Sequence, residues 1–115
     1  MKMLAFYNNK GGVGKTTAAI NVAYALAKKK KQVLVIDCDG QSNSSRFLVD
    51  AYNENCGIEQ ALVSSYISPN AALKASHYVN ISVIVSTPKM NEILPIYEQK
   101  KSEGLISIDR IKKEF

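Results

Sequence analysis

Lysine and threonine side chains stand at the end of a glycine-rich run near the start of the chain, where their types and spacing suit phosphate chemistry. The run reads Lys10, Gly11, Gly12, Val13, Gly14, Lys15, Thr16 and Thr17. Glycines let backbone N–H groups approach phosphate oxygens, and a helix beginning at Lys15 adds its positive N-terminal dipole. Lys15 would charge-balance the outer phosphates, the Thr16 hydroxyl would ligate Mg²⁺, and Thr17 would donate to an inner phosphate. The run therefore predicts a P-loop that binds a nucleoside triphosphate with magnesium.

Two carboxylates follow the next apolar run, residues 33–36. Asp37 and Asp39 alternate with Cys38 at the expected carboxyl end of a strand, where open α/β sheets place their ligands. The alternation predicts that both carboxylates share one face. Lys10 is a second lysine beside the glycines. It could reach a nucleotide held by a facing subunit, as an arginine finger does, or it could be a solvated surface lysine.

The segment 10–17, KGGVGKTT, resembles the deviant Walker A motif of the ParA/MinD family of P-loop ATPases. Residues 33–41 resemble the family's second motif, an apolar strand ending in D-x-D-P-Q. Gly40 stands where proline is usual, and we expect this glycine to loosen the turn. The opening Tyr7, Asn8 and Asn9 looks more like ParA-type proteins than MinD.

The resemblance implies a role for each matching residue. Lys10 would cross to the partner's ATP in a homodimer formed in the ATP state, while Lys15 and Thr16 would hold phosphate and Mg²⁺. Asp37 would support the magnesium shell, and Asp39 would orient the attacking water. The implied function is an ATPase switch in plasmid or chromosome partition or cargo positioning, with non-specific DNA and a stimulating protein as further partners.

Two other functions stay open. A related P-loop synthetase or ligase shares the loop and often the aspartates, although many ligases lack a lysine at position 10. A non-catalytic module would bind nucleotide without turnover. The sequence leaves open whether the chain is an enzyme, because no apolar strand ending in aspartate, the Walker B strand, follows the helices.

Composition limits the class of protein. The chain has 115 residues, 46% of them hydrophobic, and a net charge of +5 that permits attraction to DNA or another polyanion. No apolar run approaches the ~20 residues of a membrane span, and we expect no signal peptide. Cys38 and Cys56 lack metal-ligand spacing and predict reduced thiols in a cytoplasmic protein.

The predicted fold is α/β, a P-loop NTPase-type mostly parallel sheet flanked by helices. Apolar runs predict strands at 3–7, 33–36 and 81–85. Helical spacing predicts helices at 15–29, near 47–51, after Gly57, from Ser68-Pro69, from Met90 to Gly104 with a bend at Pro95, and from Ser107. Residues 1–115 would form the N-terminal part of a single P-loop ATPase domain, with the Walker B strand and C-terminal half absent. An expressed piece, a truncated gene product and a small self-completing domain are the alternatives.

Overall fold

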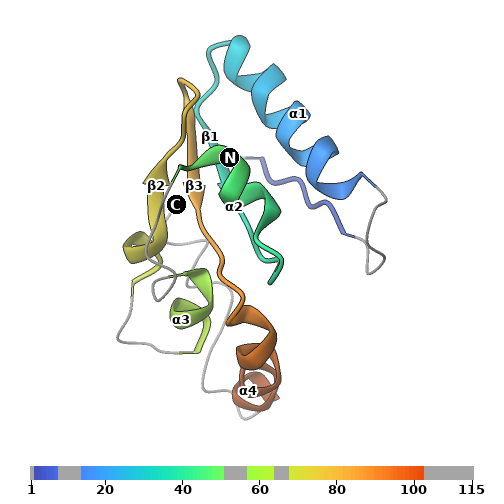
Figure 1. The fold of residues 1–115 in the computed structure, drawn as a ribbon, viewed down its shortest axis with the longest axis vertical. Coiled ribbons are helices and arrows are strands. Elements are labelled where there is room, and N and C mark those ends of the chain that lie inside the picture. Colours follow the sequence, from blue (N-terminus) through green and yellow to red (C-terminus); the bar gives the residue numbers. More distant parts are fainter. Residues whose placement is uncertain (1, 8–13, 51–56, 64–67, 103–115) are drawn as a thin grey trace.

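The computed structural model describes residues 2–7, 14–50, 57–63 and 68–102, and within them helices flank one small sheet (Figure 1). The elements in chain order are α1 (Lys15–Lys28), β1 (Val33–Ile36), α2 (Asn43–Leu48), α3 (Ile58–Val63), the 3₁₀ helix η1 (Pro69–Ala72), β2 (Leu73–Ala75), β3 (Ile81–Ile84) and α4 (Met90–Ser102). The α/β class is confirmed. The helix predicted from Ser107 and the end of the helix predicted to stop at Gly104 lie outside the described residues.

The sheet has the strand order β1-β3-β2 and is mixed. β1 and β3 run parallel, with Val33 opposite Ile81 and Ile36 opposite Ile84, as the prediction of a parallel sheet requires. β2 pairs antiparallel with β3, and Leu73 lies opposite Ile84. The sequence did not predict β2, because its three residues include Lys74 and are too few to show an alternating pattern. β1 and β2 are therefore the edge strands of this sheet.

The strand predicted at residues 3–7 is wrong. Residues 2–7 belong to no strand, and their apolar side chains are exposed, from 39% for Phe6 to 87% for Tyr7. An apolar run becomes a strand only where a neighbouring backbone accepts its hydrogen bonds and a packed face buries its side chains. The sheet formed by the described residues supplies neither to this run.

Helix α1 forms where small and straight side chains repeat at helical spacing, and it packs on the sheet through alanines. Ala23 and Ala27, four residues apart, are buried against Ile81, and Val33 and Val35 pack against the same cluster. Small side chains let the helix axis approach the strands closely. The first turn of α1 lies at the end of the sheet where β1 and β3 finish (Figure 1).

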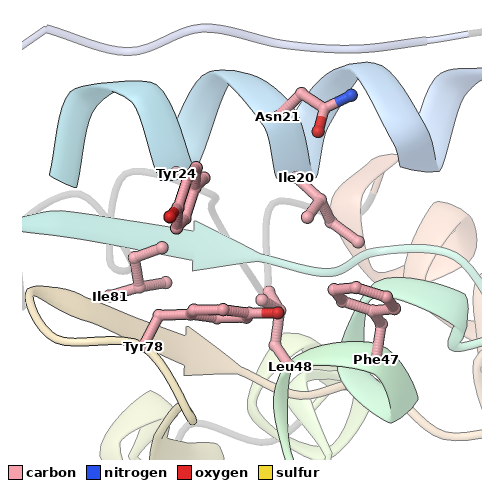
Figure 2. Close-up of a pocket in the computed structure, with 7 residues that line it drawn as sticks. All are labelled: Ile20, Asn21, Tyr24, Phe47, Leu48, Tyr78 and Ile81. Carbon is pink, nitrogen blue, oxygen red and sulfur yellow. The ribbon is translucent and has the colours of Figure 1, made fainter. Parts of the chain in front are cut away.

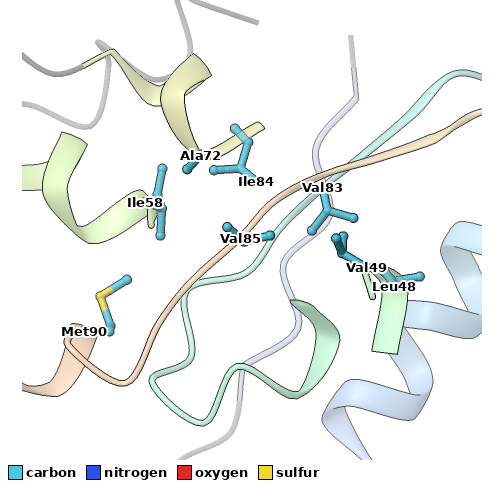
Figure 3. Packing of buried hydrophobic residues seen from close by; sticks show 8 residues of the cluster. All are labelled: Leu48, Val49, Ile58, Ala72, Val83, Ile84, Val85 and Met90. Atoms are coloured by element: carbon cyan, nitrogen blue, oxygen red, sulfur yellow. The ribbon is translucent and has the colours of Figure 1, made fainter. Parts of the chain in front are cut away.

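The larger apolar cluster joins β3 to the shorter elements around it (Figure 3). Leu48, Ile58, Val83, Ile84 and Val85 are each fully buried in it. Val49, Ala72 and Met90 complete the buried set. Burial of these side chains stabilises the packing around β3, by about 25 cal/mol per Å² of apolar surface removed from water. The cluster also fixes where the chain leaves β3 toward α4.

Backbone hydrogen bonds continue past the strands and shape the ends of the sheet. The Asp37 N–H donates to the Ile84 carbonyl at 3.0 Å, and the Ile58 N–H donates to the Val85 carbonyl at 2.8 Å. The prediction of a helix start at Ser68-Pro69 is confirmed, because the Ser68 hydroxyl accepts from the Asn70 N–H at 3.2 Å. Across the described segments, no helix combines the length and apolarity needed to cross a bilayer.

Candidate functional site

Lys15 and Asp39 meet at the end of the sheet where β1 and β3 finish. The Lys15 ammonium donates to Asp39 Oδ2 at 2.7 Å, and the two side chains are 28% and 31% exposed. Lys15 is the first residue of α1, where the helix dipole disfavours a positive charge. No acidic residue in the first turn offsets it, so Asp39 supplies the compensating charge from another element.

The N-terminus of α1 has no side-chain cap. The N-cap residue is Gly14, whose φ of 82° lies in the left-handed region that glycine adopts without steric cost, and the Ala18 N–H donates to its carbonyl at 2.8 Å. Ser, Thr, Asn or Asp at this position would satisfy first-turn N–H groups itself. A glycine leaves those donors to other acceptors, and an anion is the ligand that helix N-termini favour.

The ion pair sets the charge state of Asp39. The hydrogen bond from Lys15 is the main cause that lowers the pKa of Asp39, and the Gln41 N–H, which donates to Asp39 Oδ1 at 2.9 Å, lowers that pKa further. Partial burial of the carboxyl opposes both effects. Asp39 is consequently held as a carboxylate with one oxygen on Lys15 and the other on the turn.

Asp37 occupies a different environment. It is 6% exposed, and its Oδ2 accepts from the Ser45 N–H at 2.9 Å and from the Ser45 hydroxyl at 2.6 Å. Its Oδ1 accepts from the Asp39 N–H at 3.0 Å. The strand alternation from which one shared face was predicted does not reach the carboxylates, because β1 ends at Ile36 and residues 37–39 lie beyond it. The two carboxylates nevertheless lie in one short turn.

Ser86 joins the end of β3 to this turn, and the sequence reasoning missed it. Its hydroxyl donates to the Asp39 carbonyl at 2.6 Å, and its N–H donates to the Ser45 hydroxyl at 3.0 Å. A signal for it existed, since Ser86 follows the apolar run of β3 as Asp37 follows that of β1, and parallel strands bring such positions to one edge.

Gly40 does not loosen the turn as expected. It is buried, and a Cβ placed on it would lie 2.6 Å from Asn91 Oδ1, on the second residue of α4. Around it, the Ser42 N–H donates to the Asp39 carbonyl at 2.9 Å. The absence of a side chain at Gly40 therefore lets the Asn91 side chain pack directly against this hydrogen-bonded turn.

The remaining predicted site residues divide into two groups. Thr16 and Thr17 lie in the first turn of α1 beside Lys15, Thr16 half-buried and Thr17 exposed. Lys10, Gly11, Gly12 and Val13 lie outside the described residues. The donors present suit magnesium, because Mg²⁺ takes hard oxygen ligands and keeps several waters. Thr16 offers a hydroxyl, and Asp37 Oδ1 has accepting capacity beyond its bond to Asp39.

A separate aromatic groove lies between α1 and α2 (Figure 2). Its volume is about 260 Å³, and its lining comprises Ile20, Asn21, Tyr24, Phe47, Leu48, Tyr78 and Ile81. The Tyr24 and Tyr78 rings meet edge to face with centroids 5.6 Å apart. Lys15, Asp37 and Asp39 are not among the lining residues, so this groove is not the candidate phosphate site.

The chain is similar in sequence and in fold to proteins of one family. A family model described as an AAA domain matches residues 1–115. The chromosome partitioning protein ParA of Caulobacter vibrioides is 56% identical over 45 residues, which are 39% of this chain and 17% of that protein. A structure of a McdA variant from Cyanothece in complex with ATP is 27% identical, with a TM-score of 0.65 over 84% of this chain and 35% of that one.

A third match concerns the fold alone. Cobyrinic acid a,c-diamide synthase from Mycobacterium smegmatis, with bound ADP and magnesium, is 24% identical, with a TM-score of 0.65 over 74% of this chain and 34% of that one. The chain thus spans well under half the length of each of these proteins. The match along all 115 residues, the ParA likeness and the shared fold establish that this chain belongs to the ParA/MinD family of P-loop ATPases.

Proposed function

We propose that this chain carries the phosphate-binding half of an ATPase switch. The observation that carries the proposal is the Lys15–Asp39 ion pair at the first turn of an uncapped helix. In a P-loop enzyme, the lysine neutralises phosphate charge and a carboxylate orients the attacking water, and little other chemistry is required of the protein. Lys15 and Asp39 have the charges that these two roles need.

ATP and Mg²⁺ are the ligands we propose. The triphosphate would bind at the N-terminus of α1 and replace Asp39 as the hydrogen-bond partner of Lys15. The Asp39 carboxylate would then be available to a water molecule. Thr16 and Asp37 would hold Mg²⁺, directly or through water, and the metal would neutralise charge on the phosphates. The similar McdA variant was solved in complex with ATP, which supports the nucleotide part of this proposal.

The biological role we propose is ATP-dependent dimerisation in plasmid or chromosome partition or in cargo positioning. Lys10 would contact the nucleotide of the partner subunit, and non-specific DNA and a stimulating protein would be further partners. A cytoplasmic location is part of the proposal. The named ParA relative supports this role, and the net charge of +5 suits a polyanion.

The first test measures Mg-ATP binding and phosphate release by the wild-type chain and by Lys15→Ala. Loss of a charge-assisted contact should weaken Mg-ATP binding about 10- to 100-fold. Lys28→Ala is the matched control, because Lys28 lies in the last turn of the same helix with its ammonium over the Tyr24 ring. Equal affinity of wild type and Lys15→Ala would contradict the proposed site.

Turnover separates the proposed switch from a non-catalytic module. Lys15-dependent binding with phosphate release supports an ATPase, whereas binding without release supports a module that only binds nucleotide. Lys10→Ala should retain binding by the monomer and lose ATP-dependent dimerisation, measured by light scattering after size exclusion. Dimers that form without nucleotide and survive Lys10→Ala would contradict the switch.

A further inference from the structure

A closed ring of hydrogen bonds links the two aspartates to the end of β3. The Ser86 N–H donates to the Ser45 hydroxyl, which donates to Asp37 Oδ2. The Asp39 N–H donates to Asp37 Oδ1, and the Asp39 carbonyl accepts from the Ser86 hydroxyl. Each hydroxyl donates once within the ring, so the pattern is internally consistent.

The ring is enclosed. Ser45 and Ser86 are both 0% exposed, and Asp37 is 6% exposed. Ser42, also fully buried, adopts a left-handed φ of 59°, and its hydroxyl oxygen lies 3.1 Å from that of Ser86. Non-glycine residues rarely adopt this conformation, and such residues gather where surrounding contacts fix a functional turn. Water cannot easily replace a bond lost from such an enclosed ring.

We propose that Ser86 is a positioning residue that holds the Asp37–Asp39 turn in place for the magnesium-nucleotide complex. Ser86 contacts neither nucleotide nor metal in this proposal, which rests on the proposed function. It acts through Ser45 on Asp37 and directly on the Asp39 carbonyl. Thr87, the next residue after Ser86, begins the turn into α4, because its carbonyl accepts from the Met90 N–H at 3.0 Å. Through this turn the ring also connects α4 to both carboxylates.

Partners that orient a metal-binding carboxylate typically change metal affinity 10- to 100-fold when they are removed. We therefore expect Ser86→Ala to reduce the factor by which Mg²⁺ tightens ATP binding by about tenfold or more. Affinity for ATP in EDTA should change less than about threefold, because Ser86 bonds the backbone carbonyl of Asp39, whereas Lys15 bonds the carboxylate of Asp39 and lies outside the ring. A general loss of folded protein would instead weaken both affinities together.

The experiment measures ATP dissociation constants with Mg²⁺ and with EDTA for wild type, Ser86→Ala and Ser86→Cys. The cysteine fills the serine's space with a weak donor, so it retains the fold if the alanine does not, and it should show the same loss. Ser82→Ala is the matched control, a half-buried serine on β3 itself. Ser45→Ala should reproduce the effect, and the double variant should add little, because either change opens the same ring.

A second readout needs no nucleotide. Opening the ring should speed hydrogen exchange at the Asp39 and Ser45 amides at least about tenfold relative to the core amides of β3. If Mg²⁺ tightens ATP binding by the same factor in Ser86→Ala, Ser86→Cys and wild type, the inference is overturned and the proposed function stays intact. Failure of wild type to bind Mg-ATP would overturn the proposed function and with it the magnesium role of Ser86. Unchanged amide exchange would show that Ser86 does not hold the turn.

Discussion

The close approach of Gly40 and Asn91 predicts that Gly40→Ala changes the free energy of unfolding in opposite directions in the wild-type protein and in Asn91→Ala. A Cβ on Gly40 would lie 2.6 Å from Asn91 Oδ1 and 2.7 Å from both Cγ and Nδ2, closer than real Cβ atoms approach other heavy atoms. Something must move in Gly40→Ala. Asn91 is exposed, so its side chain can rotate, and an unfavourable rotamer costs about 0.5–1.5 kcal/mol. Residual crowding of the buried turn brings the expected clash to about 1–2 kcal/mol.

Without the asparagine the same substitution should stabilise the protein. The φ of Gly40 does not lie in the left-handed region, so alanine fits the backbone there. Gly→Ala at such positions stabilises by about 0.4–1 kcal/mol, because the unfolded chain loses conformational freedom. Gly40→Ala should therefore destabilise the wild-type protein slightly and stabilise Asn91→Ala, with a coupling of about 1–2 kcal/mol between the two sites.

Urea unfolding of wild type, both single variants and the double variant measures this coupling as a double-mutant cycle. Asn91→Ala alone should be neutral or slightly stabilising, because it places a strong helix former at an exposed position of α4. If Gly40→Ala changes the free energy of unfolding by the same amount in both backgrounds, the close approach of α4 to the turn is refuted.

Three further predictions concern the core, the ion pair and the thiol. Leu48→Ala should cost about 2–5 kcal/mol in urea unfolding because Leu48 is fully buried, whereas Phe47→Ala, 54% exposed, should cost about 1 kcal/mol. Lys15 lowers the pKa of Asp39 in the fold, so ionised Asp39 stabilises the protein above the ordinary carboxyl range and this stabilisation is lost as pH falls through the lowered pKa. Asp39→Asn should thus lower the Tm at pH 7, and the difference from wild type should shrink as pH falls below the ordinary carboxyl range. A difference in Tm that stays constant as pH falls would contradict the pairing. Desolvation of the sulfur, with the charges of Asp37 and Glu59, raises the pKa of Cys38 to about 11. Although Cys38 is exposed, its alkylation at pH 7.5 should therefore be at least about tenfold slower than that of an ordinary thiol, as measured by peptide mass spectrometry. Alkylation at the rate of a free thiol would contradict the raised pKa.

Several elements were predictable because local pattern and packing agree. The alanine spacing of α1 and the apolar runs of β1 and β3 each fit one secondary structure and one buried face. Lys15 and Asp39 were expected at one site because α1 begins, and β1 ends, at the same edge of the sheet.

Other features depend on contacts that no local pattern contains. The ring through Ser86 requires residues 41 positions apart to meet, and the need for glycine at position 40 comes from a side chain on α4. Residues 2–7 carry a strand-like pattern, but a strand is defined by its neighbours, and pattern alone does not supply them.

Within the described residues, the outer edge of β1 pairs with no strand and residues 2–7 are exposed, which has a consequence for handling the protein. Unpaired backbone at a sheet edge and a run of apolar side chains both favour self-association, which grows with concentration. The net charge of +5 opposes self-association by mutual repulsion. Salt at 0.1 M screens this repulsion between charges that lie more than about 10 Å apart. Solubility should therefore fall as ionic strength rises, and dilute, low-salt buffers should keep the chain dispersed.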